Sequence, residues 1–262
     1  MTELGLVAVQ TRFQLTSITR NRRAVALSLV FPIVLLVMFN SIFVSASDSV
    51  ELAGAKVTAH AYFTGAMLAY AIVLSGFSQL TIGLVNQRES GQLKRQRGTP
   101  VPAWTFIVAT VLRAVVTVGL MAVVLLAIGR VAYNVSISVE ALGEILLYVV
   151  LGTATMCSLG VAATAIAADV DSASAALPLV AVLLALISGI FVPVDQLPGW
   201  LQEIGRIFPV YHLTAGLQTA LGTVGDTALD PGNVAVLCVW TLWGIVFAAR
   251  RFRWEPTRAV GA

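Results

Sequence analysis

The chain has 262 residues, of which 58% are hydrophobic and 11% are charged, with a mean hydropathy of +0.90. A soluble domain carries about 25% charged residues. The composition therefore excludes an ordinary soluble protein and indicates an all-α, polytopic integral membrane protein. The net charge of +3 does not indicate a nucleic-acid-binding protein, and the distribution of the basic residues is more informative than their sum.

Residues 1–23 contain four arginines interspersed with apolar side chains. This pattern predicts either an amphipathic helix in the membrane interface or a basic cytoplasmic tail. The apolar run that follows starts near Ala24 and is too long for the hydrophobic part of a secretory signal peptide. We therefore expect it to be retained as the first membrane span.

Six apolar runs have the roughly 20 residues that a membrane-spanning helix needs. They are residues 24–44, residues 59–85, a span within residues 103–132, and residues 141–167, 173–192 and 233–249. Cys157 and Cys238 fall inside two of these runs and are expected to be buried thiols, not a disulfide or a metal pair.

The second run contains both small and polar residues. Its glycines indicate close helix packing: Gly65, Gly76 and Gly83. Its polar side chains either line a pathway or form hydrogen bonds between helices: Ser75, Ser78 and Gln79.

The loops between the runs differ strongly in basic residues. With a cytoplasmic N-terminus, three basic residues fall outside, namely Lys56, Arg130 and Arg206. Twelve fall inside: Arg12, Arg20, Arg22, Arg23, Arg88, Lys94, Arg95, Arg97, Arg250, Arg251, Arg253 and Arg258. The positive-inside rule then predicts that both termini are cytoplasmic.

The longest inside loop, residues 86–102, is also the most charged part of the chain. Its residues predict a short helix that ends at Gly98 and Pro100. The loop is either a topology signal that holds this segment inside or a docking surface for a cytoplasmic partner.

The outside segment at residues 193–232 is interrupted by Pro193, Pro198 and Pro209. Between the last two prolines, apolar side chains share one helical face: Trp200, Leu201, Ile204, Ile207 and Phe208. The spacing predicts a short amphipathic helix. We expect Trp200, Leu201, Ile204 and Phe208 to pack into the protein, while Gln202, Glu203 and Arg206 form the opposite, polar face, with Gln202 and Arg206 turned to water.

A second short helix is predicted after Pro209, where leucine recurs at every fourth position: Leu213, Leu217 and Leu221. Neither short helix is long enough to span a bilayer. The segment either re-enters the membrane, where its polar backbone must be buried in protein or line a cavity, or forms a soluble loop on the membrane surface.

Two stretches together resemble the ABC-2 family of ATP-binding-cassette transporter permeases. The inside loop RESGQLKRQRGTPVP is similar to the family's stretch of glutamate, glycine, basic residues and Thr-Pro after the second helix. The outer stretch SGIFVPVDQLPGWLQEIGRIFPVYHLTAGLQ resembles its pattern of Ser-Gly, aromatic, Pro, Leu-Pro and Trp-Leu, then Pro and Tyr. Within the family, the chain looks most like permeases of the daunorubicin-resistance type of drug exporter.

The resemblance implies a half-transporter that pairs with a second permease, identical or homologous, and with two cytoplasmic ATPase subunits. It implies that the inside loop is a coupling helix seated on an ATPase, through Arg88, Glu89, Gly91, Leu93, Lys94, Thr99 and Pro100. It also implies that the outer helices re-enter the membrane, with the motif Ser188, Gly189, Pro193, Leu197, Pro198, Trp200, Pro209 and Tyr211.

The chain contains no phosphate-binding loop, which requires Gly-Lys followed by Ser or Thr. The only lysines are Lys56, after Ala55, and Lys94, after Leu93. We therefore expect the chain not to be an enzyme by itself and to hold no cofactor, with ATP and Mg²⁺ bound by the partner ATPase.

A few polar residues allow both a functional and a structural interpretation. Arg113 is either a functional cation within the third span or an interfacial residue that reaches the inner headgroups. Asp169 and Asp171 either face an ATPase or a proton path or form a solvated turn. His60 and His212 lack neighbours at metal-ligand spacing and are expected to be structural.

We expect the transmembrane subunit of an ABC exporter in a bacterial inner membrane, moving a hydrophobic or amphipathic compound outward: a drug, a lipid or a lipid-linked molecule. Drug efflux and antibiotic resistance would be its physiological role. The alternatives are an ion-coupled secondary transporter and a non-transporting assembly subunit. Ion relays use acidic residues in the spans, and here only Glu144 lies within one.

Overall fold

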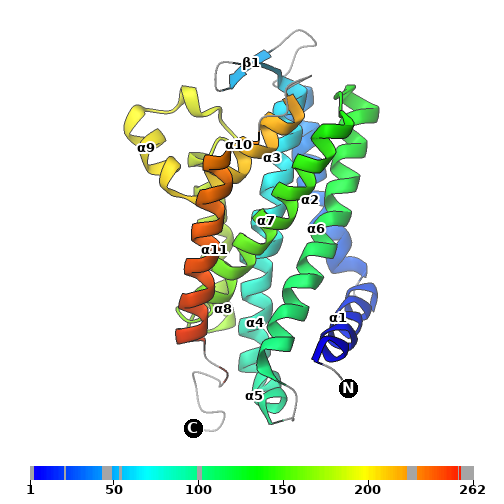
Figure 1. The fold of residues 1–262 in the computed structure, drawn as a ribbon, viewed down its shortest axis with the longest axis vertical. Coiled ribbons are helices and arrows are strands. Elements are labelled where there is room, and N and C mark those ends of the chain that lie inside the picture. The colour runs from blue at the N-terminus through cyan, green and yellow to red at the C-terminus, as the bar shows by residue number, and fades with distance from the viewer. Residues whose placement is uncertain are drawn as a thin grey trace.

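The computed structural model describes residues 3–20, 22–42, 49–52, 55–98, 102–222, 229–252 and 254. This part of the chain is mostly helical and forms an elongated bundle (Figure 1). The long helices are α1 (Glu3–Arg20), α2 (Arg22–Ile42), α3 (Ala59–Val73), α6 (Ala103–Tyr133), α7 (Val139–Ala163), α8 (Val170–Ile187) and α11 (Pro231–Arg251). The shorter elements are β1 (Ser49–Leu52), β2 (Ala55–Thr58), the π-helical η1 (Leu74–Gln79), α4 (Leu80–Glu89), α5 (Gln92–Arg97), the 3₁₀ turn η2 (Val194–Gln196), α9 (Gly199–Ile207) and α10 (Pro209–Gly222).

The centre of the bundle is one continuous helix of 31 residues, Ala59–Glu89, made of α3, η1 and α4. It is apolar on all sides in its first half, and every residue of α3 except His60 is buried. A helix that is hydrophobic all round must be surrounded by other elements, and α2, α6, α7, α8 and α10 contact it. This central helix therefore reaches from one end of the bundle to the other.

Glycines allow α7 to approach the central helix closely. A Cβ at Gly76 would lie 2.8 Å from the Cβ of Met156, and one at Gly160 would lie 2.7 Å from the carbonyl oxygen of Gly76. Gly65 is also in close contact, with backbone atoms of α10 at 3.0 Å. Close packing is thus confirmed at Gly65 and Gly76 but is wrong for Gly83, whose missing side chain would meet no atom within 4 Å.

The three polar residues of the second predicted run lie in different environments on the central helix. Ser78 Oγ donates a hydrogen bond of 3.2 Å to the carbonyl of Leu177, so it joins the central helix to α8. Ser75 is buried and Gln79 is exposed. For Ser78, the interhelical role is therefore the one the structure supports.

In the part of the chain that the structure describes, five helices are long and apolar enough to cross a membrane: Ala59–Glu89, Trp104–Tyr133, Val139–Ala163, Val170–Ile187 and Pro231–Arg251. The first predicted span corresponds to the 21-residue helix α2, in which the described side chains form the shorter apolar helix Leu29–Ile42. The count of six spans therefore stays a prediction. The fifth predicted span ends at Ile187, earlier than the expected residue 192, because the positive φ of 78° at Gly189 turns the chain out of the helix.

Elements gather at two ends of the bundle (Figure 1). One end carries α1, α5 and the last turn of α11, and the other carries the β1–β2 hairpin, α9 and α10. The hairpin pairs Ser49 with Thr58 and Leu52 with Ala55, and the sequence patterns did not predict it. The segments predicted to lie inside are thus grouped at one end and those predicted outside at the other.

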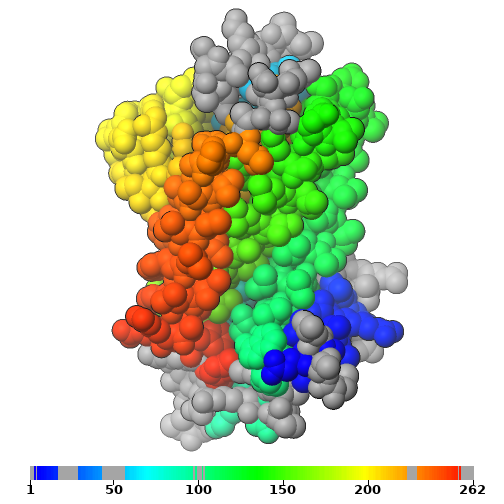
Figure 2. Space-filling model, in the orientation of Figure 1, coloured from blue at the N-terminus to red at the C-terminus, as the bar shows by residue number. Residues whose placement is uncertain are grey.

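The two cysteines differ in environment. Cys157 is buried, as expected, but Cys238 is exposed, so the prediction of two buried thiols is wrong for the second. Cys238 lies on α11, which runs along one side of the bundle (Figure 2), and the neighbouring apolar side chains of Val239 and Leu242 are exposed as well. An apolar run predicts burial in membrane or protein without distinguishing between them.

Candidate functional sites at the two ends of the bundle

The first candidate site is the elbow between α4 and α5. Gly91 has a φ of +71°, a left-handed conformation that glycine adopts without steric cost, and it turns the chain from α4 into α5. The predicted short helix is confirmed for Gln92–Arg97, and Gly98 caps its end. Arg88 and Glu89 belong instead to the last turn of α4. Thr99 and Pro100 lie outside the described residues.

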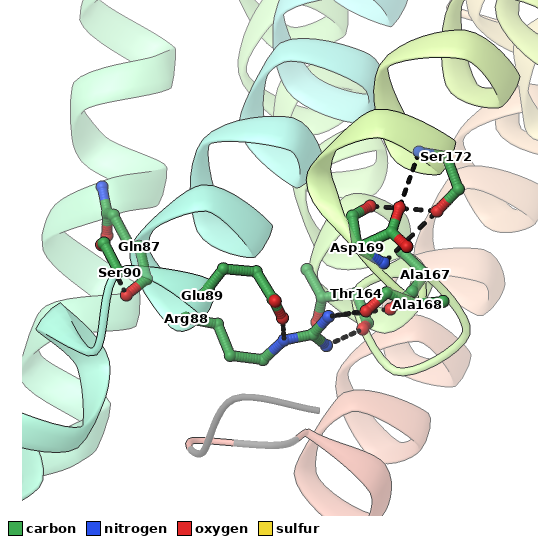
Figure 3. A network of polar contacts seen from close by, with 9 residues as sticks. All are labelled: Gln87, Arg88, Glu89, Ser90, Thr164, Ala167, Ala168, Asp169 and Ser172. Carbon is green, nitrogen blue, oxygen red and sulfur yellow. Dashed lines mark hydrogen bonds and ion pairs between the residues drawn. The ribbon is translucent and has the colours of Figure 1, made fainter. Parts of the chain in front are cut away.

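The side chain of Arg88 makes several polar contacts at this elbow (Figure 3). It is 2% exposed, and its guanidinium donates to the carbonyls of Thr164 at 2.8 Å, Ala167 at 2.8 Å and Ala168 at 3.0 Å. Its Nε also pairs with Glu89 at 3.3 Å. These carbonyls follow the C-terminus of α7, where helix carbonyls lack partners and the dipole favours a cation. Arg88 therefore fastens the elbow to the turn between α7 and α8.

The other predicted contact residues of the elbow point in different directions. Leu93 is 1% exposed and packs in an apolar cluster with Leu80, Leu84 and Phe106. Lys94 is exposed, together with the neighbouring Arg95. The buried residues thus position α5, while its basic residues face outward.

The turn between α7 and α8 is built by Asp169, which caps α8. Asp169 Oδ1 accepts from the backbone N–H of Ser172 at 2.8 Å, and Ser172 Oγ lies 3.3 Å from the backbone N–H of Asp169, a capping box. Asp171 lies in the first turn of α8 and is exposed. Asp169 therefore has a local structural role, and the turn it shapes lies against the elbow through Arg88.

The second candidate site is the outer elbow, where α8 ends and the chain turns toward α9. The carbonyl of Gly189 accepts two hydrogen bonds, from Tyr62 Oη at 2.5 Å and from Gln218 Nε2 at 3.0 Å. Ser188 is 1% exposed, and its hydroxyl has no hydrogen-bond partner within the described residues. Tyr62 and Gln218 were not singled out from sequence. Their signal in the sequence was only a polar group within a mainly apolar segment.

The segment from Pro193 to Phe208 contains the predicted amphipathic helix. Pro193 and Pro198 precede η2 and α9, with Leu197 between them. The prediction that the apolar face packs into the protein is wrong for Trp200, which is 67% exposed, and for Ile204, which is 40% exposed.

The helix instead meets the bundle on the side of Gly205. This glycine is buried, and a Cβ there would collide with the carbonyl oxygen of Ile187. The close backbone approach turns the tryptophan side of α9 away from the protein. Of the polar residues, Glu203 and Arg206 form an exposed ion pair, while Gln202 donates to the carbonyl of Leu197 at 2.9 Å and is only partly exposed.

Helix α10 begins at Pro209, as predicted, and its three regularly spaced leucines are all buried: Leu213, Leu217 and Leu221. His212 Nδ1 lies 2.7 Å from Asn233 Oδ1, and its Nε2 lies 2.9 Å from the carbonyl of Arg206. His212 therefore joins α10 to α11 and to the end of α9, while Tyr211 packs edge-on against its ring. At the far side of the same end, His60 Nδ1 lies 2.7 Å from Asn40 Oδ1 and joins α3 to α2.

An apolar groove of about 620 Å³ lies below the outer elbow, between α7, α8 and α11. Its lining is almost wholly apolar and includes Met156, Leu184, Leu201, Phe208, Trp240 and Phe247. Trp240 also donates to the carbonyl of Ile207 at 3.0 Å, which holds α11 against the end of α9. A surface of this kind accepts hydrocarbon and aromatic groups and offers nothing to a charged ligand.

The described residues contain no cluster of three or more His, Cys, Asp or Glu side chains that could hold a metal ion. The central helix carries Arg88 near one end, where it bonds to the α7–α8 turn, and Tyr62 near the other, where it bonds to the outer elbow.

Comparison with known proteins shows which protein family the chain resembles. The family model described as ABC-2 type transporter matches residues 6–221, a range that contains both elbows. A protein of Bacillus subtilis (strain 168) named "Putative transport permease YvfS" is 23% identical over 213 residues, which cover 81% of this chain and 84% of that protein.

Proposed function

Since the chain belongs to the ABC-2 type transporter family, we propose that it is the membrane-spanning subunit of an ATP-driven exporter in a bacterial inner membrane. Its two termini and α5 lie on the cytoplasmic side, and α9 and α10 lie on the outer side. The distribution of basic residues supports this orientation. The energy comes from a separate ATPase, because neither lysine of the chain lies in a phosphate-binding loop.

The ATPase binds at α5 and the adjacent α7–α8 turn. Lys94 and Arg95 are exposed on α5, and Asp171 is exposed on the neighbouring turn, so this end offers charges of both signs to a partner. Arg88 makes the elbow and the turn one unit. Two such subunits, each with an ATPase, form the complete transporter.

The observation that carries the proposal is the central helix. It is the 31-residue helix Ala59–Glu89, roughly 45 Å long at 1.5 Å per residue, and it carries Arg88 near its α5 end and Tyr62 near its outer end. Movement of α5 when the ATPases close is transmitted along this helix to the Gly189 carbonyl. There it shifts α9 and α10 and opens the exit, which is an alternating-access cycle.

The transported compound is hydrophobic or amphipathic: a drug, a lipid or a lipid-linked molecule. The almost wholly apolar groove between α7, α8 and α11 supports this class of substrate, because it can take up hydrocarbon or aromatic groups without desolvating a charge. Drug export would make the chain an antibiotic-resistance determinant.

The test begins with co-purification. The chain is expressed with ATPase subunits from the same genome and purified through a tag on the permease. We expect one of these ATPase proteins to co-purify with the permease. The double change Lys94→Glu and Arg95→Glu should reduce its recovery at least several-fold. Arg206→Glu, at the opposite end and also exposed, is the matched control and should leave recovery unchanged.

Transport is then measured in vesicles that contain the complex and a fluorescent hydrophobic dye. ATP should drive dye movement, and a mutation in the phosphate-binding loop of the ATPase should abolish it. Dye movement that needs no ATPase and follows an imposed proton gradient would replace this proposal with an ion-coupled transporter.

A further inference from the structure

A second cavity lies at the end of the bundle that carries α5. It has a volume of about 490 Å³ and is enclosed by α1, α4, α5 and α6. In Figure 1, α1 lies beside the lower part of α6, outside the main bundle. Five glutamines line the cavity, Gln10 and Gln14 from α1 and Gln87, Gln92 and Gln96 from α4 and α5, together with Arg113 of α6.

Among the described residues that line the cavity, Arg113 is the only charged one. Its Nε is buried and has no hydrogen-bond partner among the residues that the structure describes, and neither of the two ion pairs found there involves it. Arg113 is only partly exposed, and a cation held there without a counter-ion is costly. Glutamine amides are neutral, so they can orient around the guanidinium but cannot compensate its charge. The cavity is therefore suited to an anion.

The position of Arg113 along α6 places it at the boundary of the hydrocarbon. The 20 residues from Ala114 to Tyr133 span about 30 Å as a helix, which is the thickness of the hydrocarbon core of a bilayer. Arg113 is then at the depth of the phosphate groups of the inner leaflet. This agrees with an interfacial location and gives the residue a partner at that depth.

The mouth of the cavity is apolar. Val9 and Phe13 of α1 line it and are 55% and 74% exposed, and the buried Phe106 of α6 also belongs to the lining. A ligand that fits both surfaces has an anionic group for the polar interior and acyl chains for the apolar rim. Basic pockets between helices on the cytoplasmic side are suited to acidic lipid headgroups.

We propose that this cavity binds the headgroup phosphate of an acidic phospholipid of the inner leaflet, with Arg113 as its counter-ion and the glutamine amides as further donors. The lipid joins α1 to α5 and α6, so it stabilises the docking end of the permease. This site is separate from the apolar groove and is independent of the transported compound.

The test uses the full chain, purified in detergent and stripped of lipid. Three probes are titrated and followed by native mass spectrometry and thermal shift: dioctanoyl phosphatidylglycerol, dioctanoyl phosphatidylcholine and inorganic phosphate. We expect the first to bind at least tenfold more tightly than the other two, because it alone combines net negative charge with acyl chains.

Two variants test the assigned residues. Arg113→Gln removes the counter-ion, and Gln92→Glu adds a negative charge at the start of α5, where a carboxylate favours the helix. Each should weaken phosphatidylglycerol binding about tenfold or more. Arg130→Gln, an exposed arginine near the other end of α6, is the control and should not change it.

Three results would overturn the proposal. Equal binding of phosphatidylcholine would mean that charge is not recognised, and equal binding of inorganic phosphate would mean a free-anion site. Wild-type affinity in a folded Gln92→Glu variant, checked by size-exclusion chromatography, would place the lipid elsewhere even if Arg113→Gln does not fold.

Discussion

Replacing Arg88 by methionine should destabilise the permease far more than the same change at Arg95. Arg88 is 2% exposed, and its loss leaves the carbonyls of Thr164, Ala167 and Ala168 without their donor. Each hydrogen bond to a charged group contributes about 1.5–3 kcal/mol. Because the three bonds share one side chain, we expect a combined loss of about 3–5 kcal/mol, the range for breaking a buried ionic contact.

The measurement is the apparent melting temperature in one detergent, by fluorescence-detected size exclusion after heating. At about 2–4 °C per kcal/mol for a chain of this size, Arg88→Met should lower it by about 6–20 °C. Arg95 is exposed and makes one contact of 3.5 Å with the carbonyl of Ser90, so Arg95→Met should lower it by at most about 2 °C. Similar small shifts in both variants would refute the idea that Arg88 fastens the elbow to the α7–α8 turn.

Three further predictions concern packing, transmission and orientation. Gly160→Ala should reduce the yield of folded protein, since its Cβ would lie 2.7 Å from a backbone carbonyl oxygen, whereas Gly83→Ala, with open space around it, should be neutral or stabilising; equal yields would contradict the close contact. Tyr62→Phe should lower the free energy of unfolding by only about 1 kcal/mol, because Gln218 still donates to the Gly189 carbonyl. The same change should slow transport severalfold, and unchanged transport by stable protein would argue against transmission through this bond. In a chain without native cysteines, an impermeant thiol reagent should label a cysteine at Glu203 but not at Lys94 in intact cells, and the reverse result would invert the proposed orientation.

The features that could be read from the sequence are those set by local periodicity and length. Apolar runs of about 20 residues predicted most of the spanning helices, because a bilayer core demands that length. The three prolines and the spacing of Trp200 and Ile204 predicted α9, and Pro209 predicted the start of α10. Gly98 likewise predicted the end of α5. Each of these depends on residues within a few positions of one another.

The features decided by tertiary structure involve partners far apart in the chain. Nothing near Arg88 shows that its guanidinium bonds to carbonyls about 80 residues later, and its sequence context is that of a solvated, basic loop. The outer elbow similarly depends on Tyr62, 127 residues from Gly189.

The direction of the apolar face of α9 was the clearest failure of prediction. Amphipathic spacing shows that one face avoids water, but lipid and protein interior satisfy that face equally well. The outcome was decided by Gly205, which has no side chain and therefore allows the α9 backbone to rest against the end of α8. With that contact made, Trp200 and Ile204 are turned away from the bundle. Periodicity thus determined which residues share a face, and backbone contact between distant segments determined where that face points.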